Sequence, residues 1–131
     1  MKSILFLAFI LNTPNLYATG KVGTLVCKSP DFFDRTRVTF YSATKTIVYK
    51  SKYDEEEFDY IKATEDSFSR ILVGKQKDRE VYIQIRFAPD AVVTAGSVHK
   101  EVAIEITRMH ENGATASAML LDYKCQAYAP K

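Results

Sequence analysis

The chain has 131 residues, of which 47% are hydrophobic and 26% are charged. This length suits one domain better than two. The 18 basic and 16 acidic residues give a formal net charge of +2, and the two signs are mixed along the sequence. A nucleic-acid-binding domain would gather Lys and Arg on one surface, so we do not expect nucleic acid as a partner.

The first residues have the layout of a secretory signal peptide. A short basic start with Lys2 is followed by the apolar run Ile4–Leu11, a polar break and a small residue at Ala18. We therefore expect a signal peptide over residues 1–18 and one domain over residues 19–131. A run of eight apolar residues is too short for a membrane span, which needs about 20. The sequence thus predicts a secreted or periplasmic protein with no transmembrane span after cleavage.

The two cysteines stand near the start and the end of the exported part. Export makes a disulfide plausible, and Cys27 and Cys125 allow only one pairing. It would close a loop of roughly 100 residues, for which the chain-entropy model gives about 4–5 kcal/mol of stabilisation. The alternative is a pair of free, buried thiols. The sequence shows none of the close ligand spacings of a metal site, and we expect no metal and no cofactor.

The remainder reads as short strands separated by turns. Side chains alternate between apolar and polar types over several runs, as on a strand with one buried face. The eight segments in which we expect strands are Thr19–Lys28, Arg37–Tyr41, Thr46–Lys50, Phe58–Lys62, Ser67–Val73, Arg79–Phe87, Lys100–Arg108 and Ala114–Tyr128. No stretch of ten residues shows a helical period, although 91–99 has room for one helical turn.

Two of these strands can be aligned on their side chains. Placing Ile83 opposite Ile104 buries one face of each strand and sets Arg86 against Glu101 on the other. In the last strand, Met119, Leu121, Tyr123 and Cys125 form an alternating set that predicts one apolar face.

The fold class follows from these elements. Eight short strands in about 110 residues predict an all-β protein, either a small antiparallel barrel of lipocalin-like architecture or a two-sheet sandwich. A disulfide between the first and last strands favours the barrel, because closure joins those strands. A barrel of this size is either filled by side chains or holds one small ligand.

Three groups of residues are candidates for binding. The acidic run Asp54, Glu55 and Glu56, continued by Glu57, suits a cation or a basic protein, or simply a solvated connection. Phe32 and Phe33 stand in an expected loop, where they form either a binding anchor or a plug over the barrel end.

The third group is a pair of arginines. Arg79 and Arg108 share the parity of the apolar faces and would lie opposite each other in the proposed alignment. Two guanidinium groups at one level would suit an anion. The alternative is that both strands end there and the side chains turn into water.

Catalytic signals are sparse. The two histidines, His99 and His110, lie in or next to expected loops, and no Ser or Cys stands in a nucleophile motif. We therefore expect a protein without enzymatic activity, with an uncharacterised hydrolase as the less favoured alternative.

A signal peptide, about 110 β-rich residues and a cysteine in each terminal strand together resemble the small exported β-barrels of bacteria, including those that inhibit lysozyme. The serine–glycine–x–x–tyrosine motif of those inhibitors is absent, so the resemblance covers architecture and implies no site residues. The sequence hypothesis is a disulfide-closed barrel that captures a protein or small ligand at one loop-bearing end. The alternative is a structural, envelope-associated protein with a filled core.

Overall fold

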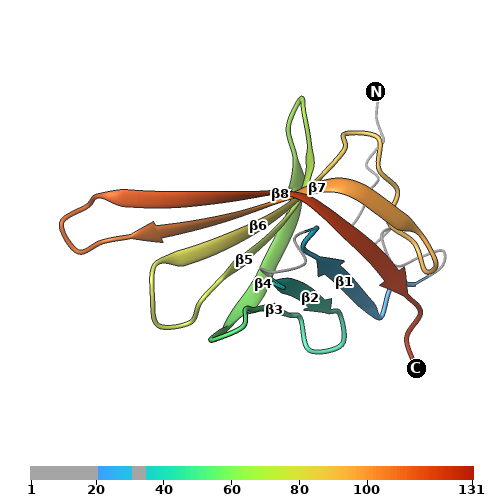
Figure 1. The fold of residues 1–131 in the computed structure, drawn as a ribbon, viewed down its shortest axis with the longest axis horizontal. Coiled ribbons are helices and arrows are strands. Elements are labelled where there is room, and N and C mark those ends of the chain that lie inside the picture. Colours follow the sequence, from blue (N-terminus) through green and yellow to red (C-terminus); the bar gives the residue numbers. More distant parts are fainter. Residues whose placement is uncertain (1–20, 31–34) are drawn as a thin grey trace.

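The computed structural model describes residues 21–30 and 35–131, which form a closed antiparallel barrel of eight strands (Figure 1). Each strand pairs with the next along the chain, and the last pairs with the first. The all-β, eight-stranded barrel predicted from the sequence is confirmed, and the two-sheet sandwich is not found. The strands are β1 (Thr24–Lys28), β2 (Arg37–Tyr41), β3 (Thr46–Lys50), β4 (Glu55–Glu65), β5 (Arg70–Lys75), β6 (Val81–Phe87), β7 (Val98–Met109) and β8 (Thr115–Tyr128).

Alternation explains why these segments are strands. In β6, Val81, Ile83, Ile85 and Phe87 are buried, whereas the three residues between them are partly exposed. The bounds of β2 and β3 are those expected from the sequence. The buried side chains of all eight strands merge into one core with Phe40 and Phe58 among its largest members, so side chains fill the barrel interior.

The seam between the ends of the chain is closed covalently. Cys27 and Cys125 lie directly opposite each other on β1 and β8, their side chains are fully buried, and they form a disulfide of 2.04 Å. The predicted pairing is therefore confirmed, and the alternative of free thiols is wrong. A disulfide of this kind is typical of proteins from oxidising compartments. No described segment forms a helix with the length and apolar character needed to cross a bilayer.

The long connection between β6 and β7 covers one end of the barrel. Ala91 and Val93 are buried against the core, and the Arg70 Nη1 donates a hydrogen bond of 2.6 Å to the Ala91 carbonyl oxygen. The helical turn allowed for residues 91–99 is absent. Two hydrogen-bonded turns stand in its place, closed by the N–H groups of Ala91 and Ser97.

The alignment expected between β6 and β7 is wrong by two residues. Ile83 lies opposite Ile106, and Ile85 lies opposite Ile104. A shift of two residues keeps each side chain of the pair on its expected face, so the core residues of β6 and β7 were assigned correctly. Arg86 then lies opposite Ala103 and forms ion pairs with Glu105, at 3.2 Å, and Asp66, at 3.5 Å, and not with Glu101.

Two irregularities bend the pair β7–β8. Residues 100 and 101 face one residue of β8, and residues 121 and 122 face one residue of β7. Glu101 and Asp122 both adopt positive φ, of 56° and 62°. Each is a β-bulge, which adds a residue to one strand and bends it. The bulge at Asp122 also exchanges the two faces of β8.

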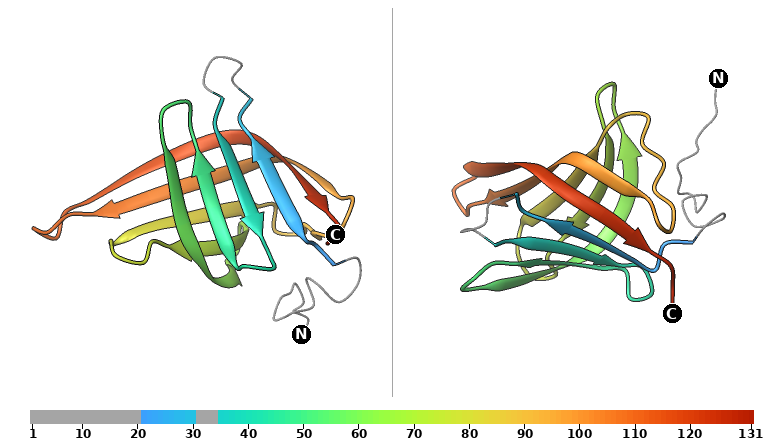
Figure 2. Two further views of the ribbon diagram at one scale, coloured as in Figure 1. Left: turned by 90° about the horizontal axis from the view of Figure 1, so that it is seen from below. Right: turned by 45° about the vertical axis from the view of Figure 1, so that its right-hand side comes forward.

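That exchange overturns the expected apolar face of the last strand. Beyond the bulge, Tyr123 and Cys125 are buried as expected, but Met119 and Leu121 are exposed. Leu120 packs against the core in their place. The hairpin formed by β7 and β8 extends well beyond the rest of the barrel (Figures 1 and 2).

Candidate functional site

The topology sorts the connections between two ends of the barrel. In a barrel of sequential antiparallel strands, alternate connections lie at the same end. One end, which we call the loop end, has the connections β1–β2, β3–β4, β5–β6 and β7–β8. At the opposite end the chain enters β1 and leaves β8. Among the described residues, those predicted from the sequence to bind a partner belong to connections or strand ends of the loop end.

Five of those residues meet in one open hollow of about 480 Å³, which we call the acidic hollow. They come from three separate parts of the chain: the start of β4, the β5–β6 connection and the end of β7. The hollow is lined by Asp54, Glu55, Glu56, Glu57, Gln76, Arg79 and Arg108. A second hollow of about 250 Å³ shares Glu57, Gln76 and Arg79 with it.

Glu56 organises the floor of the acidic hollow. It lies on the inward-facing side of β4, and its two carboxylate oxygens accept hydrogen bonds from Arg108 Nη2 at 2.7 Å and Gln76 Nε2 at 2.8 Å. Burial acts to raise the pKa of Glu56, but the hydrogen bonds from Arg108 and Gln76 outweigh it and hold the pKa below its usual value. The carboxylate therefore stays ionised and fixes Arg108.

The two arginines are not opposite each other, contrary to the strand pairing that the sequence predicts. Val81 lies opposite Arg108, and Arg79 belongs to the β5–β6 connection. They still line the same hollow. Arg108 is neutralised by Glu56, whereas exposed Arg79 forms no ion pair with any described residue. The arrangement is thus a mixed-charge surface and not a paired-arginine anion site.

The acidic run lies partly in a strand and not wholly in a connection. Glu55 and Glu57 pair with Lys50 and Val48 of β3, so the ladder extends through the run. Ser51 shapes the turn before it, since its Oγ accepts a hydrogen bond of 3.1 Å from the Asp54 N–H. The pairing holds the Glu55 and Glu57 carboxylates on the exposed surface. Within the described ranges, no three His, Cys, Asp or Glu side chains gather closely enough to hold a metal ion.

Phe32 and Phe33 lie outside the described residues, so their role as anchor or plug stays a prediction. The chain on either side of them is held at the loop end. The Ser29 N–H donates to the Thr36 carbonyl oxygen at 3.0 Å, and the hydroxyl groups of Thr36 and Tyr123 form a buried hydrogen bond. Their connection therefore begins and ends beside β8.

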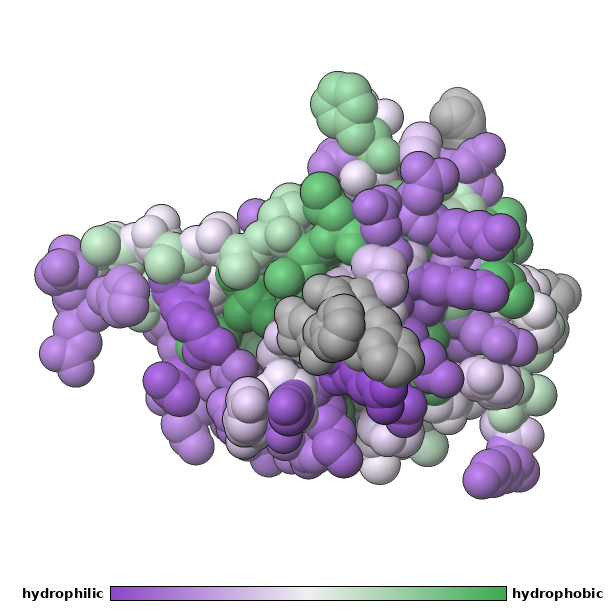
Figure 3. All heavy atoms as spheres, in the orientation of Figure 1, coloured by the Kyte–Doolittle hydropathy of each residue, from purple (hydrophilic) through white to green (hydrophobic). Residues whose placement is uncertain are grey.

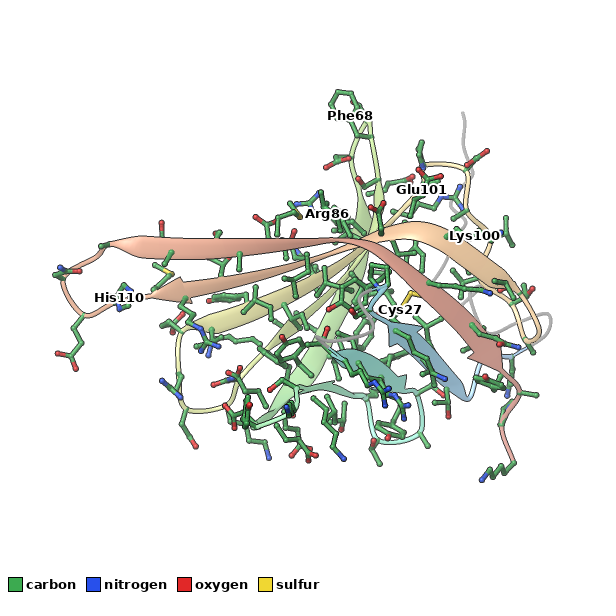
Figure 4. The ribbon with its side chains drawn as sticks, in the orientation of Figure 1. Cys27, Phe68, Arg86, Lys100, Glu101 and His110 are labelled. Carbon is green, nitrogen blue, oxygen red and sulfur yellow. A yellow bond between two sulfur atoms is a disulfide. The ribbon has the colours of Figure 1, made fainter. Side chains whose placement is uncertain are left out.

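The two histidines lie at opposite ends of β7, His99 near its start and His110 just after its end. His99 is half-buried against Phe87, and burial lowers its pKa. Its Nε2 lies 2.9 Å from the Ser97 Oγ, but that hydroxyl also donates to the Thr94 carbonyl oxygen at 2.7 Å. The Ser97 hydroxyl proton is thus used in the turn at Thr94–Ser97 and is not donated to His99. His110 is exposed near the tip of the β7–β8 hairpin (Figure 4).

The sequence reasoning missed the surface of the projecting hairpin. Met109, Met119 and Leu121 are large apolar side chains that it leaves exposed, and an apolar stripe follows β8 from the hairpin toward the barrel (Figure 3). One signal was available. The adjacent pair Leu120–Leu121 interrupts strict alternation just before Asp122, a residue type that tolerates positive φ.

A third hollow, of about 790 Å³, opens at the opposite end of the barrel between the β2–β3 turn and the C-terminal residues. Comparison of the chain with protein-family models, curated proteins and solved structures finds no match. The function is therefore argued from the chemistry of this chain alone.

Proposed function

We propose that this protein is an exported binding module, secreted or periplasmic, that holds a protein with a basic surface at its loop end. The observation that carries the proposal is the acidic hollow. It combines a fixed Glu56–Arg108 floor with exposed carboxylates that form no ion pair with any described residue.

The balance of charge selects the partner. The lining of the acidic hollow contains four carboxylates and two guanidinium groups, and one guanidinium is already neutralised by Glu56. Complementary charge steers association and fixes orientation more than it adds affinity. Arg79 supplies one cation at the rim, where it would orient a carboxylate of the partner.

The filled interior favours a protein over a small molecule as the ligand. A small-molecule site is normally a deep, mostly apolar concavity. Here the core side chains occupy the barrel, and the acidic hollow is open and predominantly charged. The same filled interior supports the second candidate, a structural protein of the cell envelope without a captured partner.

Charge reversal at the rim tests the proposal. Glu55 and Glu57 have exposed side chains, so the double variant Glu55→Lys/Glu57→Lys should lose at most about 1 kcal/mol of stability, mainly because Glu55→Lys places a like charge opposite Lys50. Immobilised wild type should retain a basic protein from the exported fraction in a salt-sensitive manner, and the double variant should lose it. Asp90→Lys, an exposed reversal on the β6–β7 connection at the opposite end, is the control for position and should retain it; the single variant Glu57→Lys, which carries the same charge change as Asp90→Lys, should bind more weakly than that control.

Retention of the same protein by all four forms would refute the binding site. Retention by none of them would favour the structural candidate.

A further inference from the structure

The last strand of the barrel is much longer than the first. β8 pairs with β1 only over Lys124–Tyr128, whereas its pairing with β7 continues to Thr115 (Figure 2). In the described part of the chain, Thr115–Leu121 therefore has a neighbour on one side only. We call this segment the free edge of β8.

The hydrogen-bond pattern shows which backbone groups point out from the free edge. The His110 N–H donates to the Ala114 carbonyl oxygen at 2.7 Å, and the Met109 N–H points to the other side, where it donates to the carbonyl oxygen of Glu80, just before β6, at 2.9 Å. Residues of an antiparallel strand bond alternately to one side and the other. Counting from Ala114, the residues whose N–H and C=O groups point outward are Thr115, Ser117, Met119 and Leu121.

This edge lacks the usual protection against pairing. Natural sheet edges are guarded by charged side chains, proline or bulges. From Asn112 to Leu121 the sequence contains no charged residue and no proline. Met119 is 49% exposed and Leu121 is 60% exposed, so the uncovered backbone is accompanied by uncovered apolar side chains. The first guard is the bulge at Asp122, where the segment ends.

We propose that the free edge of β8 pairs antiparallel with the same edge of a second copy of this chain. A two-fold axis at Ala118 sets Ser117 opposite Met119 of the second copy and Thr115 opposite Leu121. Every outward N–H and C=O group of the segment then has a partner. The two barrels share one continuous sheet across this axis.

The side chains and charges of the free edge are compatible with pairing to the free edge of a second copy. In this pairing, even-numbered residues of one copy lie opposite even-numbered residues of the other. Apolar Leu120 therefore faces Ala116 of the second copy on the inner face, and the small Ala118 side chains allow close approach at the axis. The segment is uncharged, and Asp122 of each copy lies opposite Ala114 of the other, at opposite ends of the pairing. No like charges are opposed. This symmetrical fit selects a second copy over a strand from another protein.

The oligomeric state of the disulfide-intact protein tests the proposal. Sedimentation velocity over a range of concentrations should show a monomer–dimer equilibrium. Met119→Lys should weaken the dimer at least about tenfold, since the two ammonium groups become diagonal neighbours across the axis. Val92→Lys places the same charge on a 64% exposed residue of the β6–β7 connection and should dimerise like wild type.

The outcomes are decisive in both directions. A wild type that stays monomeric at every concentration overturns the proposal, even if it captures another protein. Equal dimerisation of Met119→Lys and wild type does so too. Glu55→Lys/Glu57→Lys should dimerise normally, which separates a failure of this inference from a failure of the binding function.

Cross-linking tests the register. Residues facing each other across a non-hydrogen-bonded antiparallel pair have Cα atoms about 4.5 Å apart, within reach of a disulfide. Ala118→Cys should therefore give a covalent dimer under mild oxidation. Ala116→Cys, on the same face of the same strand, should not, because its counterpart is Leu120. Equal cross-linking of the two variants, or none by Ala118→Cys, refutes the register.

Discussion

Reduction of the Cys27–Cys125 disulfide offers the sharpest test of how this barrel is stabilised. The two cysteines are 98 residues apart in sequence. In the chain-entropy model, a loop of about 100 residues corresponds to about 4.7 kcal/mol of stabilisation. The stability of a whole domain is typically about 5–15 kcal/mol. Reduction should therefore remove a large share of the free energy of unfolding.

Urea unfolding of the oxidised and reduced protein, monitored by circular dichroism, measures this loss. With a urea slope of about 1–3 kcal/mol/M, the midpoint should fall by roughly 1.6–4.7 M. Cys27→Ala/Cys125→Ala should be less stable than the reduced wild type, because both side chains are fully buried and their truncation leaves a cavity. A difference below about 1 kcal/mol between oxidised and reduced protein would refute the entropic reasoning.

Two further predictions concern single residues. Glu101 has a φ of 56°, so Glu101→Gly should raise the free energy of unfolding by up to about 1 kcal/mol and Glu101→Val should lower it; equal urea midpoints would contradict this. Burial raises the pKa of Tyr60 to about 12, whereas an unfolded tyrosine titrates near 10. The stability from this shift is therefore complete below pH 10 and lost as the pH rises to 12. Tyr60→Phe should lose less stability than wild type between pH 9 and 11, measured by urea midpoints, and equal losses would count against the assignment.

The faces of the strands were predictable because alternation is a local property. In β6 every second residue is buried, as the sequence alone indicates. The register between β6 and β7 was not predictable to the residue. Ile104 and Ile106 are equally good apolar neighbours for Ile83, and the β6–β7 connection is long enough to allow either pairing. Only the packing of the whole barrel decides between alignments that differ by two.

The bulge at Glu101 was beyond sequence reasoning for a different reason. Glu101 at positive φ has no local signature, because glutamate is not a residue that favours this conformation. The bulge at Asp122 then reversed the expected orientation of Met119 and Leu121. A single inserted residue thus converts a predicted core face into an exposed apolar edge.

The candidate site was predicted residue by residue but not as a unit. Asp54–Glu56, Arg79 and Arg108 entered as separate clusters, and the structure places them around one hollow. The contact between Glu56 and Arg108 links residues that are 52 positions apart. No local sequence pattern predicts such a contact, because it depends on the number of strands between the two residues and on the tilt of each strand in the barrel.

The even number of strands has a consequence for how the molecule can be mounted. The polypeptide enters β1 and leaves β8 at the same pole, opposite the acidic hollow. A fusion partner, a surface tether or an affinity tag joined after Lys131 would lie at the end of the barrel opposite the acidic hollow. Such an attachment leaves the opposite pole facing outward and unobstructed, as required for immobilising the protein in a capture experiment.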